Sequence, residues 1–284
     1  MSYCGNVVCK PGLTVLIKKY QMINEILVEQ FCTPPEHEET DIDRKAFSEA
    51  TILDIEFENR ILKGYSMGIG PNVLLVHGWG SRASHLVLLA RYIANNGFRV
   101  VIFDGPAHGR SKKMDHKDLS NMFEFGRAIS CFAKRIGNVY AVIAHSLGAI
   151  ATVFAITGTG QLSGYKFSTE KLILISTPIS VSRIIENYSR NRGELNLMAE
   201  LTCSLESAFN FIVSEYDLSL AIQYLSSKIL IIHDEQDEEM PVSDALLLKN
   251  KYEKIILKLT NGYGHQKILV NREMLNSIKE FLIT

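Results

Sequence analysis

The stretch Asn138–Thr152 constrains the fold more than any other part of the 284-residue chain. Apolar residues run almost without a break over Val139–Ala144, and after Ser146 they recur at helical spacing over Leu147–Thr157. A short, continuous apolar run is typical of a strand that is buried on both faces of a parallel sheet. The stretch therefore predicts a strand, a sharp turn at Ser146 and a helix.

The residues around this turn are small for a mechanical reason. The segment Ala144-His145-Ser146-Leu147-Gly148 fits the motif G-x-S-x-G, a tight strand-to-helix turn that presents a nucleophilic serine, except that Ala144 replaces the first glycine. Strand and helix pass so close at such a turn that bulky side chains would collide, and Gly148 keeps the helix side open. The same residues also fit a plain strand followed by a helix with a serine N-cap, which is a common arrangement without catalytic meaning.

The composition excludes several classes of protein. With 46% hydrophobic residues, 21% charged residues and a formal net charge of -1, the chain has no basic excess that would suggest a nucleic-acid partner. The cysteines are odd in number and form no C-x-x-C pair, so neither a disulfide framework nor a zinc site is predicted: Cys4, Cys9, Cys32, Cys131 and Cys203. A secretory leader and an apolar run near ~18 residues are both missing, which predicts a cytoplasmic protein without a transmembrane segment.

The first fifty residues predict a helical extension. Apolar residues at steps of three and four indicate an amphipathic helix that ends before Pro34-Pro35: Leu13, Leu16, Ile17, Tyr20, Ile23, Leu27 and Phe31. We expect this helix to pack on the body of the protein. A membrane-surface or partner-binding role is the alternative, and only Lys18 and Lys19 support it. The acidic segment Glu36–Asp43 is expected to be a solvated linker.

Strands and helices alternate along the rest of the chain. Predicted strands are Thr51–Phe57 and Ile61–Met67, joined as a hairpin at Glu58-Asn59, then Asn72–His77, Arg99–Phe103, Val139–Ala144, Lys171–Ser176, Lys228–His233 and Lys254–Leu259. Predicted helices are Ala83–Asn96, Asp118–Ile136, Leu147–Thr157, Ser243–Tyr252 and Gln266–Leu282. The alternation predicts a mostly parallel, doubly wound sheet with helices on both faces.

The segment Ile179–Ser226 breaks this alternation, because it has helical spacing and no convincing strand. We interpret it as an inserted helical cap. It carries more apolar residues than a solvated loop would: Ile184, Ile185, Leu195, Leu197, Met198, Leu201, Leu205, Phe209, Phe211 and Ile212. Some of them should line a pocket over Ser146, or else all of them only hold the cap together.

Polar motifs follow the predicted strands directly, at the edge where the functional loops of such sheets gather. They are His77-Gly-Trp-Gly-Ser81, the turn at Ser146, the loop from His233 to Pro241, and Gly262-Tyr-Gly-His265. With the loop at residues 104–111, which is like D-x-x-G-x-G-x-S apart from Ala107, these motifs make the chain resemble the α/β-hydrolase superfamily. The resemblance covers residues 51–178 and 227–284, where it implies an α/β-hydrolase core, and the residue pattern adds a helical cap at 179–226 and a helical extension at 1–50.

The resemblance also implies chemical roles. Ser146 would be the nucleophile, His265 the base that takes its proton, and an acid after the strand Lys228–His233 would orient His265. The backbone amides of Trp79 and Leu147 would stabilise the oxyanion. The expected function is hydrolysis of a carboxylic ester of a small-molecule acyl substrate, without a metal or an organic cofactor. Thioesters, lactones and amides, acyl transfer to another acceptor, and a non-catalytic scaffold remain as alternatives, and the oligomeric state is not predicted.

The choice of the acid rests on spacing, because five carboxylates crowd one loop: Asp234, Glu235, Asp237, Glu238 and Glu239. In the superfamily pattern H-G-x-x-D-x-x-V-P the acid lies four residues after the histidine and four before the proline, and His233 and Pro241 frame Asp237 in this way. Asp234 then takes the place of the glycine, which suggests a left-handed backbone there. The alternative position after the preceding strand has no support, because residues 176–180 contain no carboxylate. The predicted triad is Ser146, Asp237 and His265.

Overall fold

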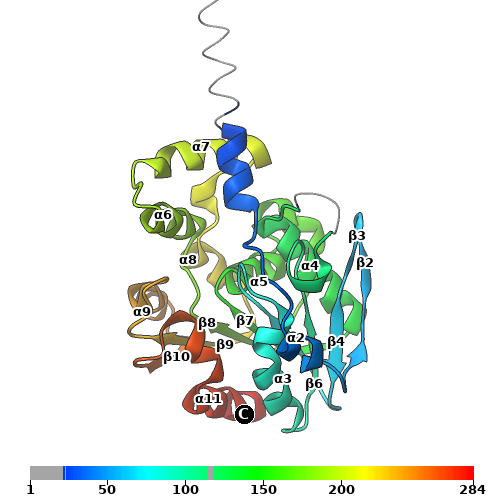
Figure 1. Cartoon of the computed structure of the whole chain (residues 1–284). Coiled ribbons are helices and arrows are strands. Elements are labelled where there is room, and N and C mark those ends of the chain that lie inside the picture. The colour runs from blue at the N-terminus through cyan, green and yellow to red at the C-terminus, as the bar shows by residue number, and fades with distance from the viewer. Residues whose placement is uncertain (1–21, 23, 114–117) are drawn as a thin grey trace, which may run out of the picture.

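One large sheet lies at the centre of the molecule (Figure 1). The structure is a computed structural model that describes residues 22, 24–113 and 118–284. In this part of the chain the sheet is built from β1 (Thr51–Ile52), β4 (Gly64–Met67), β5 (Asn72–Val76), β6 (Arg99–Phe103), β7 (Val139–His145), β8 (Lys171–Ile175), β9 (Lys228–Asp234) and β10 (Ile255–Thr260). The strands lie in the order β1-β4-β6-β5-β7-β8-β9-β10. All neighbours from β6 to β10 are parallel, which confirms the prediction of a mostly parallel sheet.

The predicted hairpin at the start of the sheet forms differently from the expectation. Each of its two strands is divided, so that β1 and β4 pair with each other in the main sheet. The inner halves, β2 (Ile55–Phe57) and β3 (Arg60–Leu62), make a separate antiparallel pair around the turn at Glu58. Gly64 stands at the division, and a Cβ atom there would lie 2.4 Å from the carbonyl oxygen of Leu53. Close packing at this glycine is a tertiary contact, which the local pattern does not reveal.

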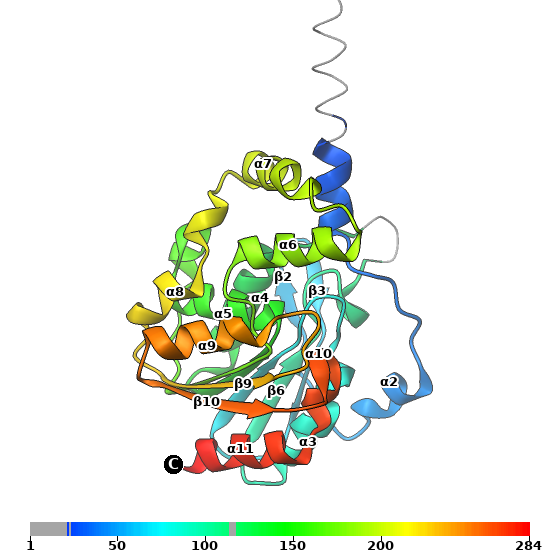
Figure 2. The ribbon, with the colours of Figure 1, turned by 90° about the vertical axis from the view of Figure 1, so that its left-hand side faces the viewer.

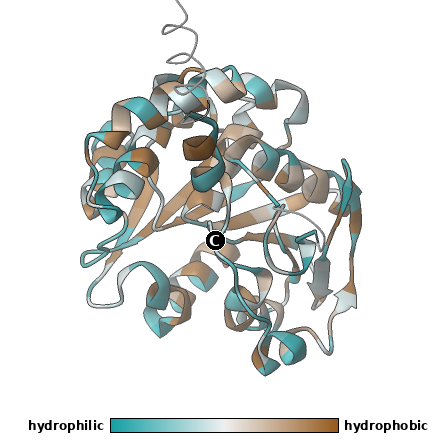
Figure 3. Ribbon diagram, turned by 45° about the horizontal axis from the view of Figure 1, so that its top comes forward, coloured by the Kyte–Doolittle hydropathy of each residue, from teal (hydrophilic) through white to brown (hydrophobic). Residues whose placement is uncertain are grey.

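Helices cover both faces of the sheet, and successive residues of each strand point alternately to one face and to the other. Leu74 and Val76 of β5 belong to the apolar core with α4 (Met122–Ile136), α5 (Leu147–Thr157) and α9 (Val242–Lys251). Val73 and Leu75 belong to a second core with α3 (Val87–Ala94) and α11 (Arg272–Ile283). The central strands are therefore apolar on both sides. Figure 3 shows them largely in the brown of hydrophobic residues.

Two predicted helices differ from the expectation at or near their starts. The helix predicted from Asp118 starts at Met122, because the side chain of Asn121 caps it by accepting a hydrogen bond from the amide of Glu124 (2.9 Å). The helix predicted over Gln266–Leu282 is divided into α10 (Gly264–Lys267), a 3₁₀ turn (Ile268–Val270) and α11. Asn271 caps α11 in the same manner, so two asparagines set these helix starts.

The segment after β8 is helical in the described structure. It forms α6 (Val181–Asn191), α7 (Leu197–Phe209) and α8 (Leu218–Ala221), and its β structure is limited to one isolated bridge between Ser180 and Asp217. Figure 2 shows α6 and α7 on one side of the sheet, away from α3 and α11. The division of the chain into a core and a cap stays a prediction.

The N-terminal helix lies next to α7 in both ribbon views (Figures 1 and 2). Residues 24–32 are helical, and Leu27 and Phe31 pack against the core that contains α4 and α5. The other residues of the predicted apolar stripe lie outside the described residues: Leu13, Leu16, Ile17, Tyr20 and Ile23. Lys18, Lys19, Cys4 and Cys9 also lie outside them. None of the helices that the structure describes is long and apolar enough to cross a bilayer.

The acidic segment at residues 36–43 is exposed apart from Asp43, as expected of a solvated linker, but it is attached to the body of the protein. Ion pairs fasten it to the loops after β5 and β6, joining Glu36 to Lys112, Glu39 to Arg110 and Asp43 to Arg82. Its C-terminal part starts α2 (Asp41–Ala46), where Thr40 and Asp43 form a capping box. The ring of His37 lies 2.7 Å from the carbonyl oxygen of Gly80. Acidic residues in this segment therefore have basic partners that are distant in the sequence.

Candidate active site

Ser146 occupies a strained turn between β7 and α5. Its φ of 52° and ψ of -125° are rare for a residue with a side chain, and such a conformation costs on the order of 1–3 kcal/mol. Its amide donates a hydrogen bond to the carbonyl oxygen of Ile175 (3.0 Å), which helps to hold the turn. A Cβ atom on Gly148 would lie 2.2 Å from the carbonyl oxygen of His77, so only glycine fits there. Ala144 is buried within β7, where its methyl group is accommodated.

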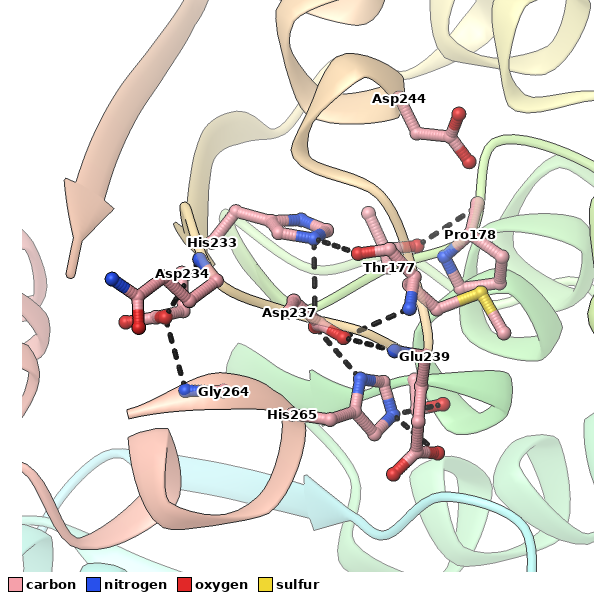
Figure 4. Close-up of polar contacts among 12 residues, drawn as sticks. Thr177, Pro178, His233, Asp234, Asp237, Glu239, Asp244, Gly264 and His265 are labelled. Carbon is pink, nitrogen blue, oxygen red and sulfur yellow. Dashed lines mark hydrogen bonds and ion pairs between the residues drawn. The ribbon is translucent and has the colours of Figure 1, made fainter. Parts of the chain in front are cut away.

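The structure brings the three residues of the predicted triad into one chain of hydrogen bonds. Ser146 Oγ lies 3.0 Å from His265 Nε2, and His265 Nδ1 lies 2.8 Å from Asp237 Oδ2. The other carboxylate oxygen of Asp237 accepts hydrogen bonds from the amides of Glu239 (3.0 Å) and Met240 (2.8 Å). Figure 4 shows His265 between Asp237 and Glu239. All three residues of the triad are at least 90% buried.

Burial by itself raises the pKa of Asp237. The hydrogen bond and charge of His265 and the amide of Met240 act in the opposite direction and outweigh burial, so the pKa lies below the ordinary value. Asp237 is therefore a carboxylate at neutral pH. A buried carboxylate 2.8 Å from Nδ1 fixes that nitrogen as the protonated one and leaves Nε2 free to accept the proton of Ser146.

Asp234 has a structural role that differs from the expectation. It is the last residue of β9 and has no positive φ, so the predicted left-handed backbone is wrong. Its buried carboxylate accepts five hydrogen bonds, from the hydroxyl of Thr260 and from the amides of Gln236, Gly262, Tyr263 and Gly264. Burial raises its pKa, but these bonds outweigh burial and lower the pKa overall. Asp234 thus holds in place the loop that leads into α10, the helix that contains His265.

The candidate oxyanion donors are the amides of Trp79 and Leu147. Leu147 is the first residue of α5, where an amide has no partner within its own helix, and the positive end of the helix dipole favours an anion. Neither amide donates a hydrogen bond within residues 24–113 and 118–284. Trp79 contributes to the cavity beside Ser146, so both residues border the same space.

Two buried histidines hold the loop that carries Trp79. His77 Nε2 accepts a hydrogen bond from the amide of Gly105 (2.9 Å), and His108 Nε2 accepts one from the amide of Gly80 (3.0 Å). An amide can only donate, so in both rings Nδ1 carries the proton and bonds a carbonyl oxygen at 2.7 Å. Burial lowers both pKa values, that of His108 to about 4, so both rings are neutral at physiological pH. His108 thus ties its own loop to the loop after β5.

His145 and His233 hold the backbone of the site, which the sequence did not predict. His145 Nε2 lies 2.9 Å from the carbonyl oxygen of His265, and burial followed by the charge of His265 lowers the pKa of His145 to about 3. His233 Nε2 lies 2.8 Å from the carbonyl oxygen of Met240, in the loop that presents Asp237. Both residues lie within motifs that the sequence showed, but nothing in the sequence indicated these contacts.

An apolar cavity of about 250 Å³ lies beside Ser146. The predicted cap residues divide: Ile184, Leu205, Phe209 and Phe211 line the cavity, Ile185 and Leu201 are in the core, and Leu195 and Ile212 are exposed. The sequence did not predict that Phe31 and Cys32 of the N-terminal helix, and Met122 and Phe123 of α4, would also line it. Phe31 meets Tyr188 of α6 edge to face, with ring centroids 5.1 Å apart. The N-terminal helix thus forms part of the cavity wall.

A second hollow in the described structure lacks the hydrogen-bonded groups found around Ser146. This larger hollow of about 810 Å³ lies between residues 33–43 and the loop after β6, but Ser146 does not line it, and its arginines Arg82 and Arg110 are ion-paired. Among the described residues, no group of three or more His, Cys, Asp or Glu side chains could hold a metal ion.

The family of the chain follows from comparison with known proteins. Residues 73–218 match the Alpha/beta hydrolase family. This match covers more than half of the chain, so the protein belongs to that family, and both the predicted fold and the resemblance are confirmed. A search of the curated proteins found no match.

Solved structures share this fold at low sequence identity. An esterase of Pyrococcus furiosus has a TM-score of 0.64 at 16% identity, over 89% of this chain and 96% of its own. A membrane phospholipase A, titled a bacterial virulence factor, has a TM-score of 0.64 at 15% identity, over 96% of both chains. A thioesterase domain from the curacin biosynthetic pathway has a TM-score of 0.60 at 14% identity, over 84% of this chain and 100% of its own. The three titles name acyl hydrolases of different substrates.

Proposed function

We propose that the protein is a serine hydrolase that cleaves a carboxylic ester through an acyl-enzyme. Ser146 is the nucleophile, His265 the general base and Asp237 the acid that orients it. The observation that carries this proposal is the hydrogen-bonded chain from Ser146 Oγ through His265 to Asp237, which opens onto an apolar cavity. Membership of a hydrolase family supports it. An esterase and a phospholipase among the structural neighbours are consistent with an ester as the substrate.

The reaction uses the residues in a fixed order. Ser146 Oγ attacks the carbonyl carbon of the ester while its proton moves to His265 Nε2, and Asp237 stabilises the imidazolium that forms. The amides of Trp79 and Leu147 donate to the oxyanion. The bond to the alcohol then breaks, and the alcohol leaves with the proton from Nε2. Water repeats these steps to release the acid and restore Ser146, so no cofactor is required.

The cavity supports a small or medium, uncharged acyl group. Its walls are largely aromatic and aliphatic, with Phe209, Phe211 and Leu205 on one side and Phe31 on another. A helical cap at residues 179–226 and a helical extension at residues 1–50 would form these walls, on a core of residues 51–178 and 227–284. We also propose a cytoplasmic location, which the odd number of cysteines and the free thiols of Cys32 and Cys131 support.

The test is covalent labelling by a fluorophosphonate together with turnover of aryl esters of graded chain length. Ser146→Ala should abolish labelling and lower kcat by on the order of 10³-fold or more, because the members of a triad act as a unit. Ser243→Ala, a change at an exposed serine in α9, is the matched control and should keep both activities. Labelling and turnover that survive in a folded Ser146→Ala protein would refute the proposal. Acyl thioesters and added alcohol acceptors in the same assay separate the thioesterase and acyltransferase alternatives.

A further inference from the structure

Glu239 stands at the mouth of the cavity, beside the histidine of the triad. Its Oε2 lies 3.7 Å from His265 Nε2 (Figure 4). The position of its backbone is fixed, because its amide donates to Asp237 Oδ1 at 3.0 Å. The side chain is 48% exposed, so the carboxylate can meet both solvent and a bound molecule. Glu239 is thus tied to the triad through its backbone and faces the reacting nitrogen with its side chain.

Among the described residues, the carboxylate of Glu239 has no permanently cationic partner, because of the basic side chains only the titratable ring of His265 lies within 4.0 Å of it. The described part of the chain places no lysine or arginine nitrogen within 4.0 Å of the Glu239 carboxylate. The cavity lining contains no lysine or arginine, and it also contains no aspartate. The neighbouring acids carry the same sign of charge and do not offset it: Glu235 accepts a hydrogen bond from Asn261, and Glu238 is exposed. The space next to His265 Nε2 therefore carries a negative potential.

The proposed reaction places one half of the substrate in this space. To receive its proton from His265 Nε2, the oxygen of the leaving alcohol must come within hydrogen-bond reach of that nitrogen. The acyl half lies in the apolar cavity, so the alcohol half is the part that meets Glu239. We propose that Glu239 selects the charge of the alcohol, favouring esters of cationic alcohols such as amino alcohols or quaternary ammonium alcohols and disfavouring anionic ones. This inference rests on the proposed function.

The same arrangement disfavours acyl carriers that bear phosphate near the scissile bond. Their leaving group brings negative charge towards Glu239, and no described cation in the cavity offsets it. The interaction of two unit charges about 7 Å apart, in surroundings close to water in polarity, changes a rate about three- to eightfold for each charge. Because Glu239 is half-exposed, added salt should reduce this effect.

Three butyrate esters of similar size test the proposal: butyrylcholine, its uncharged isostere 3,3-dimethylbutyl butyrate, and the anionic 2-sulfonatoethyl butyrate. For the wild type, kcat/KM should fall in that order, by about three- to eightfold at each step. In Glu239→Gln the ratios of cationic to neutral and of neutral to anionic ester should both move close to one. Glu238→Gln, one residue away and outside the cavity lining, is the matched control and should keep the wild-type ratios.

The outcomes separate this inference from the proposed function. If the wild type cleaves none of the esters and takes no fluorophosphonate label, the proposed function fails. If the wild type cleaves them with equal kcat/KM, or if Glu239→Gln keeps the wild-type ratios, the selection by Glu239 is refuted. A measurement on the wild type alone guards against a variant that does not fold. Raising the ionic strength to about 0.5 M should compress the ratios, and ratios that do not change with salt would overturn an electrostatic origin.

Discussion

Replacing Asp234 by asparagine should destabilise the protein, although Asp234 does not touch Ser146 or His265. Its carboxylate accepts five hydrogen bonds in a fully buried position. Asparagine keeps one oxygen, which can still accept from Gln236, Gly262 and Gly264. The other atom becomes an NH₂ group, which can only donate and therefore meets the amide of Tyr263 as a second donor. Thr260 can turn its hydroxyl to accept, whereas the backbone amide of Tyr263 has no such freedom.

The size of the effect follows from these bonds. A buried amide left without a partner costs about 1–3 kcal/mol, and bonds to a neutral oxygen are weaker than those to a carboxylate. We expect the free energy of unfolding to fall by about 2–4 kcal/mol. For a chain of 284 residues this corresponds to a loss in Tm of roughly 3–7 °C. Asp237→Asn should lower kcat by up to ~10⁴-fold instead, by analogy with serine proteases, and should change Tm less.

The pH dependence of the unfolding temperature provides a second test of the role of Asp234. The pKa of Asp234 is lowered in the folded protein from its ordinary value of 3.8, so its ionised form contributes stability that is fully present above that value. This contribution is lost as the pH falls further, through the lowered folded value. Thermal unfolding of wild type and Asp234→Asn should therefore differ most near about pH 7 and converge in acid. An Asp234→Asn protein that unfolds at the wild-type temperature near neutral pH would show that the reasoning is wrong.

Two further predictions concern the cavity and a loop. Phe209→Ala should shift the preference towards esters with a longer acyl chain, because Phe209 lines the cavity. Ile212→Ala, at an exposed residue three positions later, is the control and should leave the preference unchanged. The measurement is kcat/KM as a function of chain length, and equal profiles for wild type and Phe209→Ala would show that Phe209 does not shape the pocket. Ala107 has a φ of 62° at a position where the superfamily loop has glycine. Ala107→Gly should therefore raise the free energy of unfolding, measured in urea, by up to about 1 kcal/mol. A decrease would show that the backbone at Ala107 is not strained.

The central strands could be predicted from the sequence to within a residue or two. Their apolar runs are buried on both faces, and glycine, proline or a polar motif ends most of them. The division of the hairpin at Gly64 and the ion pairs of residues 36–43 could not be predicted, because both depend on partners that the fold brings from elsewhere. Glu36 and Lys112, for example, are 76 residues apart. Charge alone indicated an exposed segment, and only the fold supplies the basic partners.

The candidate site shows the same limit. Motif order and spacing were sufficient to name Ser146, Asp237 and His265, and the structure places His265 within hydrogen-bond distance of the other two. The support around them was not predicted, since His145 reaches a carbonyl 120 residues away in the sequence and Phe31 joins the cavity from the N-terminal helix. Such contacts have no local signature. Their residues become informative only when the neighbouring loops are known.

The order of the strands has a consequence for the synthesis of the chain. β7 and Ser146 lie in the middle of the sheet, but Asp237 and His265 follow the last two strands, β9 and β10. Ser146 and His265 are 119 residues apart, so a ribosome that adds about 5–20 residues per second needs roughly 6–24 s to pass from one to the other. During that interval Ser146 has neither His265 nor Asp237 beside it. The acylation of Ser146 that we propose can therefore begin only once β9 and β10 have emerged and paired.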